Sequence, residues 1–150
     1  MVGEMEKASF NAEMFMRDHN MVINWLLVSI IFVFALILLP FSYPKMDLIF
    51  ALIFSLLLLA LFLSTFSIVK HEKSLKKICS KGSNETLMLA HRKIAVAAGL
   101  LFTGAMGISY VFMIMFKLGY WIHFIVFFFI FLIVFILIGK LNKRFLSSFK

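Results

Sequence analysis

Four long apolar runs occupy most of this 150-residue chain, and they limit its possible folds more than any other feature. The runs cover residues 22–39, 46–69, 94–116 and 120–138. A helix needs about 20 apolar residues to cross the hydrocarbon core of a bilayer, and each run is near or above that length. Because the core holds no water, the backbone groups of a span must bond within the span. The pattern therefore predicts four transmembrane helices.

The composition also requires a lipid surrounding. Hydrophobic residues make up 63% of the chain, and 20 of them are phenylalanine. A soluble domain of this size keeps much more charge on its surface. Membrane strands would alternate apolar and polar residues, whereas residues 124–138 are apolar throughout. The fold class expected is an all-α membrane protein.

Short connections predict how consecutive helices pair. Pro40 and Pro44 mark a turn after the first run, and Lys117, Leu118 and Gly119 separate the last two runs. Connections this short place consecutive helices side by side and antiparallel. We therefore expect two antiparallel hairpins, with the amino and carboxyl termini on the same side of the membrane.

The longer central connection, residues 70–93, has helical features of its own. Glu72 and Lys76 form an i,i+4 pair in the favourable orientation. Gly82 is a typical residue just after a helix, and Asn84 is a typical helix N-cap, with Glu85 in the first turn. We predict that the second helix continues to about Ser80, that the third begins near Glu85, and that together they form a helical hairpin beyond the membrane.

Basic residues lie on one side of the predicted helices. They are concentrated in residues 70–93 and in the tail, whereas the opposite connections hold only Lys45 and Lys117. Positive residues remain in the cytoplasm, so both termini and the central hairpin are predicted there, with the protein in the inner (plasma) membrane. These side chains are candidates for binding anionic lipid headgroups or an acidic partner: Lys70, Lys73, Lys76, Lys77, Lys81, Arg92 and Lys93.

The chain divides into three parts. Residues 1–21 are predicted to be a cytoplasmic or interfacial amphipathic segment, residues 22–139 the transmembrane domain, and residues 140–150 a basic cytoplasmic tail. The net charge of +8 fits this topology. No nucleic-acid partner is expected, because the basic residues lack interleaved aromatic residues and adjoin the membrane.

The third apolar run carries small residues at helical spacing. Ala95, Gly99, Thr103 and Gly107 recur every four residues. Small side chains on one face allow another helix to approach closely. This small-residue face is the candidate interface, either within the four-helix bundle or between subunits of an oligomer.

Two histidines form a weaker candidate site. His71 and His91 flank the tip of the predicted central hairpin at similar distances, so they could lie level with each other. Paired histidines can bind haem or a metal ion. Unrelated interfacial histidines would show the same spacing, so the expectation is no metal and no cofactor, with a haem-carrying redox subunit as an alternative.

Function can be predicted only in outline. The sequence has no nucleophile–base pair, phosphate-binding loop or pair of carboxylates, so we expect no enzymatic activity. We expect a membrane protein that acts by oligomerisation or partner binding. Its size and architecture are similar to those of sensors and effectors of bacterial antiviral systems, pore-forming holins and bacteriocin immunity proteins. A pore-like or sensor–effector component and an accessory or immunity-type subunit both remain open.

Overall fold

The structure, a computed structural model, describes residues 12–42, 45, 47–79, 85–116 and 120–147. In these residues it consists of four α-helices: α1 (Ala12–Ser42), α2 (Leu48–Cys79), α3 (Glu85–Phe116) and α4 (Tyr120–Ser147). Each helix contains a stretch long and apolar enough to cross a membrane. The predicted all-α membrane architecture is therefore confirmed at this level.

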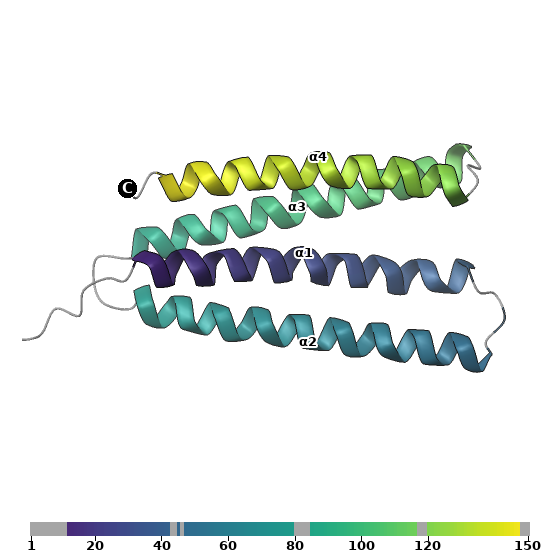
Figure 1. Cartoon of the computed structure of the whole chain (residues 1–150), viewed down its shortest axis with the longest axis horizontal. Coiled ribbons are helices and arrows are strands. Elements are labelled where there is room, and N and C mark those ends of the chain that lie inside the picture. The colour runs from purple at the N-terminus through teal and green to yellow at the C-terminus, as the bar shows by residue number, and fades with distance from the viewer. Residues whose placement is uncertain (1–11, 43–44, 46, 80–84, 117–119, 148–150) are drawn as a thin grey trace, which may run out of the picture.

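Consecutive helices run in opposite directions (Figure 1). One end of the molecule thus collects the start of α1, the end of α2, the start of α3 and the end of α4, and we call it the charged end. The longest helices, α2 and α3, have 32 residues each, or roughly 48 Å at 1.5 Å per residue. Since a bilayer core is about 30 Å thick, these helices are longer than one crossing requires.

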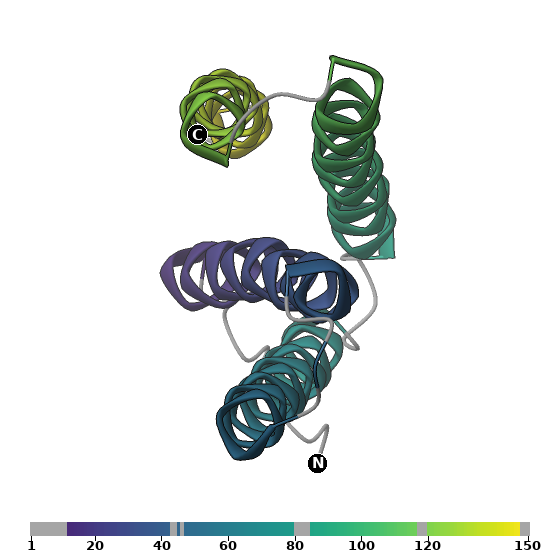
Figure 2. The same cartoon turned by 90° about the vertical axis from the view of Figure 1, so that its right-hand side faces the viewer.

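The helices do not close into a square bundle. Seen end-on, α2, α1 and α3 follow one another, and α4 lies beside α3 (Figure 2). The contact between α1 and α2 is the most extensive, followed by α3 with α4 and α1 with α3. Parts of α2, α3 and α4 consequently have no neighbouring helix and expose large apolar side chains, which suits a lipid surrounding.

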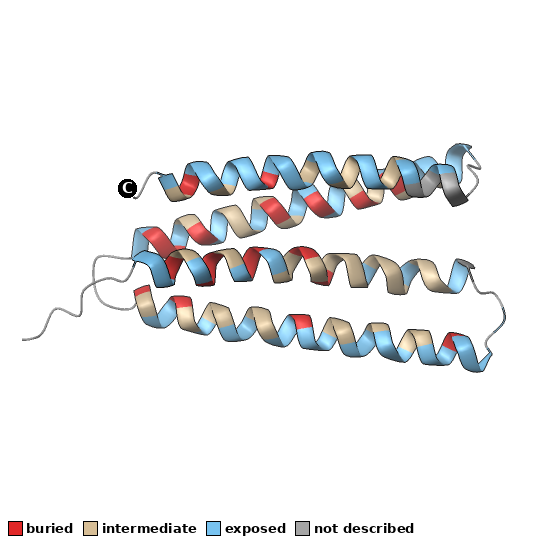
Figure 3. Cartoon of the chain, in the orientation of Figure 1, coloured by how far each residue is buried: buried red, intermediate tan, exposed pale blue. Residues whose placement is uncertain are grey.

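Buried side chains are concentrated towards the charged end (Figure 3). One apolar cluster joins the ends of all four helices and includes Phe15, Leu75, Met88 and Phe145. A second cluster lies further along the molecule, where side chains of α1, α3 and α4 pack around Phe102. The helices are thus held together most firmly at the end where their charged residues lie.

Helix α1 extends beyond the predicted span of residues 22–39 at both ends. Residues 12–21, which belong to the predicted cytoplasmic or interfacial segment 1–21, form the first turns of α1. Phe15 and Val22 extend the buried face of that helix, which gives these turns a packing partner. At the other end, α1 passes through Pro40 to Ser42 instead of ending before the proline. A proline this close to a helix end removes few backbone hydrogen bonds.

Other helix limits follow from identifiable residues. Asp47 caps α2, because its carboxylate accepts a 2.8 Å hydrogen bond from the backbone N–H of Phe50. As predicted, α2 reaches Cys79 and α3 begins at Glu85. The predicted stop at Gly82, the cap at Asn84 and the turn at residues 117–119 lie outside the described residues.

Candidate functional site

A network of polar side chains lies inside the charged end, and every helix contributes to it. Its central members are His19 and Asn20 from α1, Glu72 from α2, His91 from α3 and Asn142 from α4. His19 and His91 are almost completely buried, with relative exposures of 0% and 1%. We call these five residues the polar network.

The two buried histidine rings contact each other directly. Nδ1 of His19 lies 2.5 Å from Nδ1 of His91, and the rings meet nearly edge to face. On its other side, Nε2 of His91 lies 3.1 Å from a carboxylate oxygen of Glu72. This chain of contacts connects α1, α3 and α2.

Two amides continue the network to α4. Nε2 of His19 lies 2.5 Å from Oδ1 of Asn142. The amide nitrogen of Asn142 donates a 2.6 Å hydrogen bond to Oδ1 of Asn20. Asn142 therefore bridges two consecutive residues of α1 and fixes the end of α4 against it.

A second buried ionic group lies next to the network. Asp18 is only 2% exposed, and its carboxylate lies 3.3 Å from Nε of Arg17 and 3.8 Å from Nδ1 of His71. Burying a carboxylate is strongly unfavourable unless it is paired. These partners offset that cost and give α1 a polar connection to α2.

Apolar side chains enclose the polar groups. Phe15 stacks parallel to His19, with the ring centroids 6.1 Å apart, and Phe145 contacts both of these rings. Leu75 and Cys79 of α2 belong to the same buried cluster. Hydrogen bonds are stronger in such an apolar enclosure, and a polar group without a partner is more costly there.

The two histidines selected from the sequence have different partners. His91 is held by His19 and Glu72, whereas His71 lies near Asp18. Within the described ranges, no group of three or more His, Cys, Asp or Glu side chains is arranged to hold a metal ion. The partner of His91 is instead His19, which the continuous start of α1 brings into contact with it.

The small-residue face on α3 is divided between two environments. Towards the charged end, Ala95 packs against the second apolar cluster, and a Cβ atom at Gly99 would lie 3.6 Å from Leu26 of α1. Further along α3, Thr103 is exposed, and a Cβ at Gly107 would have no neighbouring atom within 4 Å. Gly104 beside them is equally open. Of these four positions, Ala95 and Gly99 therefore pack against other helices of the same chain, whereas Thr103 and Gly107 do not.

The predicted basic residues surround the charged end. Six of the seven are exposed, and Lys81 lies outside the described residues. Arg92 also approaches Glu72, with 4.0 Å between Nε and Oε1. The exposed six are Lys70, Lys73, Lys76, Lys77, Arg92 and Lys93.

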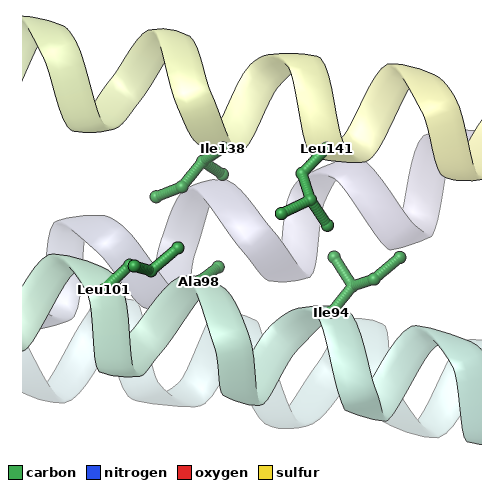
Figure 4. A pocket seen from close by; sticks show the side chains of 5 residues that line it. All are labelled: Ile94, Ala98, Leu101, Ile138 and Leu141. Carbon is green, nitrogen blue, oxygen red and sulfur yellow. The ribbon is translucent and has the colours of Figure 1, made fainter.

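A hollow between α3 and α4 has a different character (Figure 4). All of its lining side chains are apolar: Ile94, Ala98, Leu101, Ile138 and Leu141. Ligand sites combine apolar walls with a few convergent polar groups that orient the ligand. This hollow has no such group and continues the interhelical packing.

Sequence reasoning missed the polar network, because Asp18, His19 and Asn20 resemble the solvated start of a span. One signal was present. Phe15, His19 and Val22 are all buried and recur at i, i+4 and i+7 on one face of α1, so the apolar spacing of the span continues through the polar residues. That continuity indicates that the polar side chains share the inward face of the helix.

The comparisons with known proteins give no relative: no protein-family model, no curated protein and no solved structure matches the chain.

Proposed function

We propose that the protein is a non-enzymatic integral membrane protein that acts by assembling with other membrane-embedded chains. Its form would be a pore-like or sensor–effector oligomer in the inner membrane, of the general kind used in bacterial defence. The observation that carries this proposal is the open half of the small-residue face on α3, around Thr103, Gly104 and Gly107.

This surface suits helix association in lipid. Transmembrane helices associate through close backbone approach at small residues, since lipid tails provide no hydrophobic force between them. Gly104 and Gly107 are open, and exposed Leu100 and Val111 flank them on the same side of α3. A helix from a second copy could pack here more closely than lipid chains can.

The charges support a cytoplasmic position for both termini. Exposed basic side chains are gathered around the charged end, where α1 begins and α4 ends. Positive residues favour the cytoplasmic side, and each contributes about 1 kcal/mol of attraction to an anionic membrane surface. We infer that the charged end projects into the cytoplasm and contacts anionic lipid headgroups or an acidic partner.

The native mass of the protein extracted gently from its own membranes tests the proposal. We expect a homo-oligomer of defined size for the native chain. Gly107→Leu should reduce it to a smaller species, because the leucine blocks close approach. Gly139→Leu is the matched control, since Gly139 on α4 is equally open but lies outside the small-residue face. A native chain that runs as a monomer without partners would contradict the proposal.

A specific observation favours an accessory or immunity-type subunit as the second candidate. The exposed hydroxyls of Ser55 and Thr65 donate to backbone carbonyls of α2 itself, those of Ala51 and Leu61. Such hydroxyls are satisfied locally and do not indicate a polar pore lining. A stoichiometric second membrane protein in the native complex would favour this candidate over the homo-oligomer.

The haem hypothesis has less support. Both ring nitrogens of His91 are already in contact with side chains, Nδ1 with His19 and Nε2 with Glu72. A haem ligand would require one of these contacts to break. The absorption spectrum of the purified protein, with or without a Soret band, decides this alternative.

A further inference from the structure

The polar network joins all four helices at the charged end, and its hydrogen bonds determine how many protons it holds. Asn142 donates through its amide nitrogen to Asn20, so it presents its carbonyl oxygen to His19. An amide oxygen only accepts hydrogen bonds. Nε2 of His19 must therefore carry a proton and donate it to Asn142.

At the opposite end of the polar network, the contact with Glu72 requires His91 to carry a proton as well. Its Nε2 faces the Glu72 carboxylate at 3.1 Å, and an ionised carboxylate only accepts. Nε2 of His91 must therefore also carry a proton. Between the rings, the two Nδ1 atoms are in contact, and one of them must donate to the other.

These conditions place three protons on the four ring nitrogens. Two neutral imidazoles hold only two protons, so the His19–His91 pair carries one positive charge. The Glu72 carboxylate is adjacent to His91, whereas His19 contacts a neutral amide.

Other charged groups approach this pair from three helices. Arg92 of α3 shares Glu72, and on α1 the Asp18 carboxylate is engaged by Arg17 and by His71 of α2. From α4, the polar group in contact is Asn142, while the basic residues of that segment are exposed: Lys140, Lys143 and Arg144. Glu72 is thus the carboxylate in direct contact with the pair.

We propose that the His19–His91 pair is a proton-dependent latch for the charged end of the molecule. With three protons, the pair ties α3 to α2 through Glu72 and α1 to α4 through Asn142. Loss of the third proton removes a donor, so one contact fails and this end loosens. Because the third proton is lost as the pH rises, the latch holds at acidic pH and weakens towards alkaline pH.

The structure also defines the competing arrangement. A neutral pair could keep every contact if both amides were reversed, so that Asn142 donated to His19 and accepted from Asn20, or if a protonated Glu72 donated to His91. Either network would hold two protons on the ring nitrogens and would not respond to pH in this way. Three protonated ring nitrogens therefore indicate the latch, and two indicate a network that does not respond to pH.

Nitrogen-15 NMR of the native chain in lipid bilayers, with labelled histidine, counts those protons directly. At about pH 6 we expect three protonated nitrogens in the pair, falling to two at about pH 9. Asn142→Asp should retain the third proton to a higher pH, because a carboxylate cannot reverse and donate. Two protonated nitrogens throughout this range would overturn the proposal.

The single cysteine provides a second measurement without any substitution. Cys79 is buried in the apolar cluster beside the network, so its reaction with a thiol reagent reports opening of this end. An exposed cysteine, Lys76→Cys in a Cys79→Ser chain, measures how thiol ionisation alone changes the reaction rate with pH. After division by that rate, we expect the reaction rate of Cys79 to rise about tenfold or more between about pH 6 and 9.

Glu72→Gln should abolish this pH dependence, because an amide can donate to a neutral His91. Glu85→Gln is the matched control, since Glu85 is exposed at the start of α3 and should retain the native response. A corrected Cys79 rate that is independent of pH in the native chain would overturn the latch. Such a result would leave the proposed oligomer unaffected, because the latch and the small-residue face are separate.

Discussion

At the scale of single residues, the buried serines of the helices differ in whether their hydroxyls have a partner on another helix. The hydroxyl oxygens of Ser29 on α1 and Ser64 on α2 lie 2.8 Å apart and are buried. Each also lies within hydrogen-bond distance of a carbonyl of its own helix, and the two hydroxyl protons can serve two of these three contacts at a time. Ser109 on α3 is buried too, but within the described part of the chain its hydroxyl has no hydrogen-bond partner.

Ser64→Ala and Ser109→Ala should therefore affect stability differently. Ser64→Ala removes an interhelical bond, and such bonds in membrane proteins contribute about 0.6 kcal/mol. Ser109→Ala removes a buried group that is not hydrogen-bonded, so we expect no loss or a small gain. Reversible unfolding in mixed detergent micelles measures both free energies. An equal loss in the two variants would contradict this assignment of partners.

The residue scale also shows where sequence reasoning reached its limit. The exposed positions of the lysines at the charged end follow from their charge. The contact between His19 and His91, 72 positions apart, depends on α1 beginning at Ala12, ahead of the apolar run. No local pattern contains that information.

At the scale of helices, the apolar runs predicted each element well, whereas their ends were harder to predict. Glu85 and Cys79 bound α3 and α2 as expected, because polar residues and local charge pairs mark these limits. Helix α1 begins at Ala12, before the predicted span, and two of its early polar residues, Asp18 and His19, are buried. Pro40 was taken as a turn, but α1 continues to Ser42, since propensity alone does not fix the last turn of a helix.

The ends of α2 offer a direct test of orientation. Lys45 precedes this helix at one end of the molecule, and Lys73 lies near its other end. In a Cys79→Ser chain, cysteine at Lys73 should react with an impermeant reagent only from the cytoplasm, and cysteine at Lys45 only from outside. Both positions are exposed, so accessibility is limited by the membrane alone. The reverse labelling pattern would invert the proposed topology.

At the scale of the whole molecule, the charged end and the open part of α3 lie at different positions along the helices. The charged end is held together by the polar network and the apolar cluster around Leu75. Further along α3, Gly104 and Gly107 remain uncovered. This division, with tight packing at one end and an open surface along one helix, is the basis for proposing assembly through α3 and a separate pH response at the charged end.

Oxidative crosslinking in native membranes tests the central claim of self-assembly most directly. In a Cys79→Ser chain, Thr103→Cys should form a disulfide-linked dimer, because two copies would meet at this face. Leu59→Cys is the control, since Leu59 is exposed on α2 and lies outside the small-residue face. A strong dimer band for Thr103→Cys and none for Leu59→Cys is the predicted result. No dimer at Thr103, or equal dimers at both positions, would contradict assembly through α3.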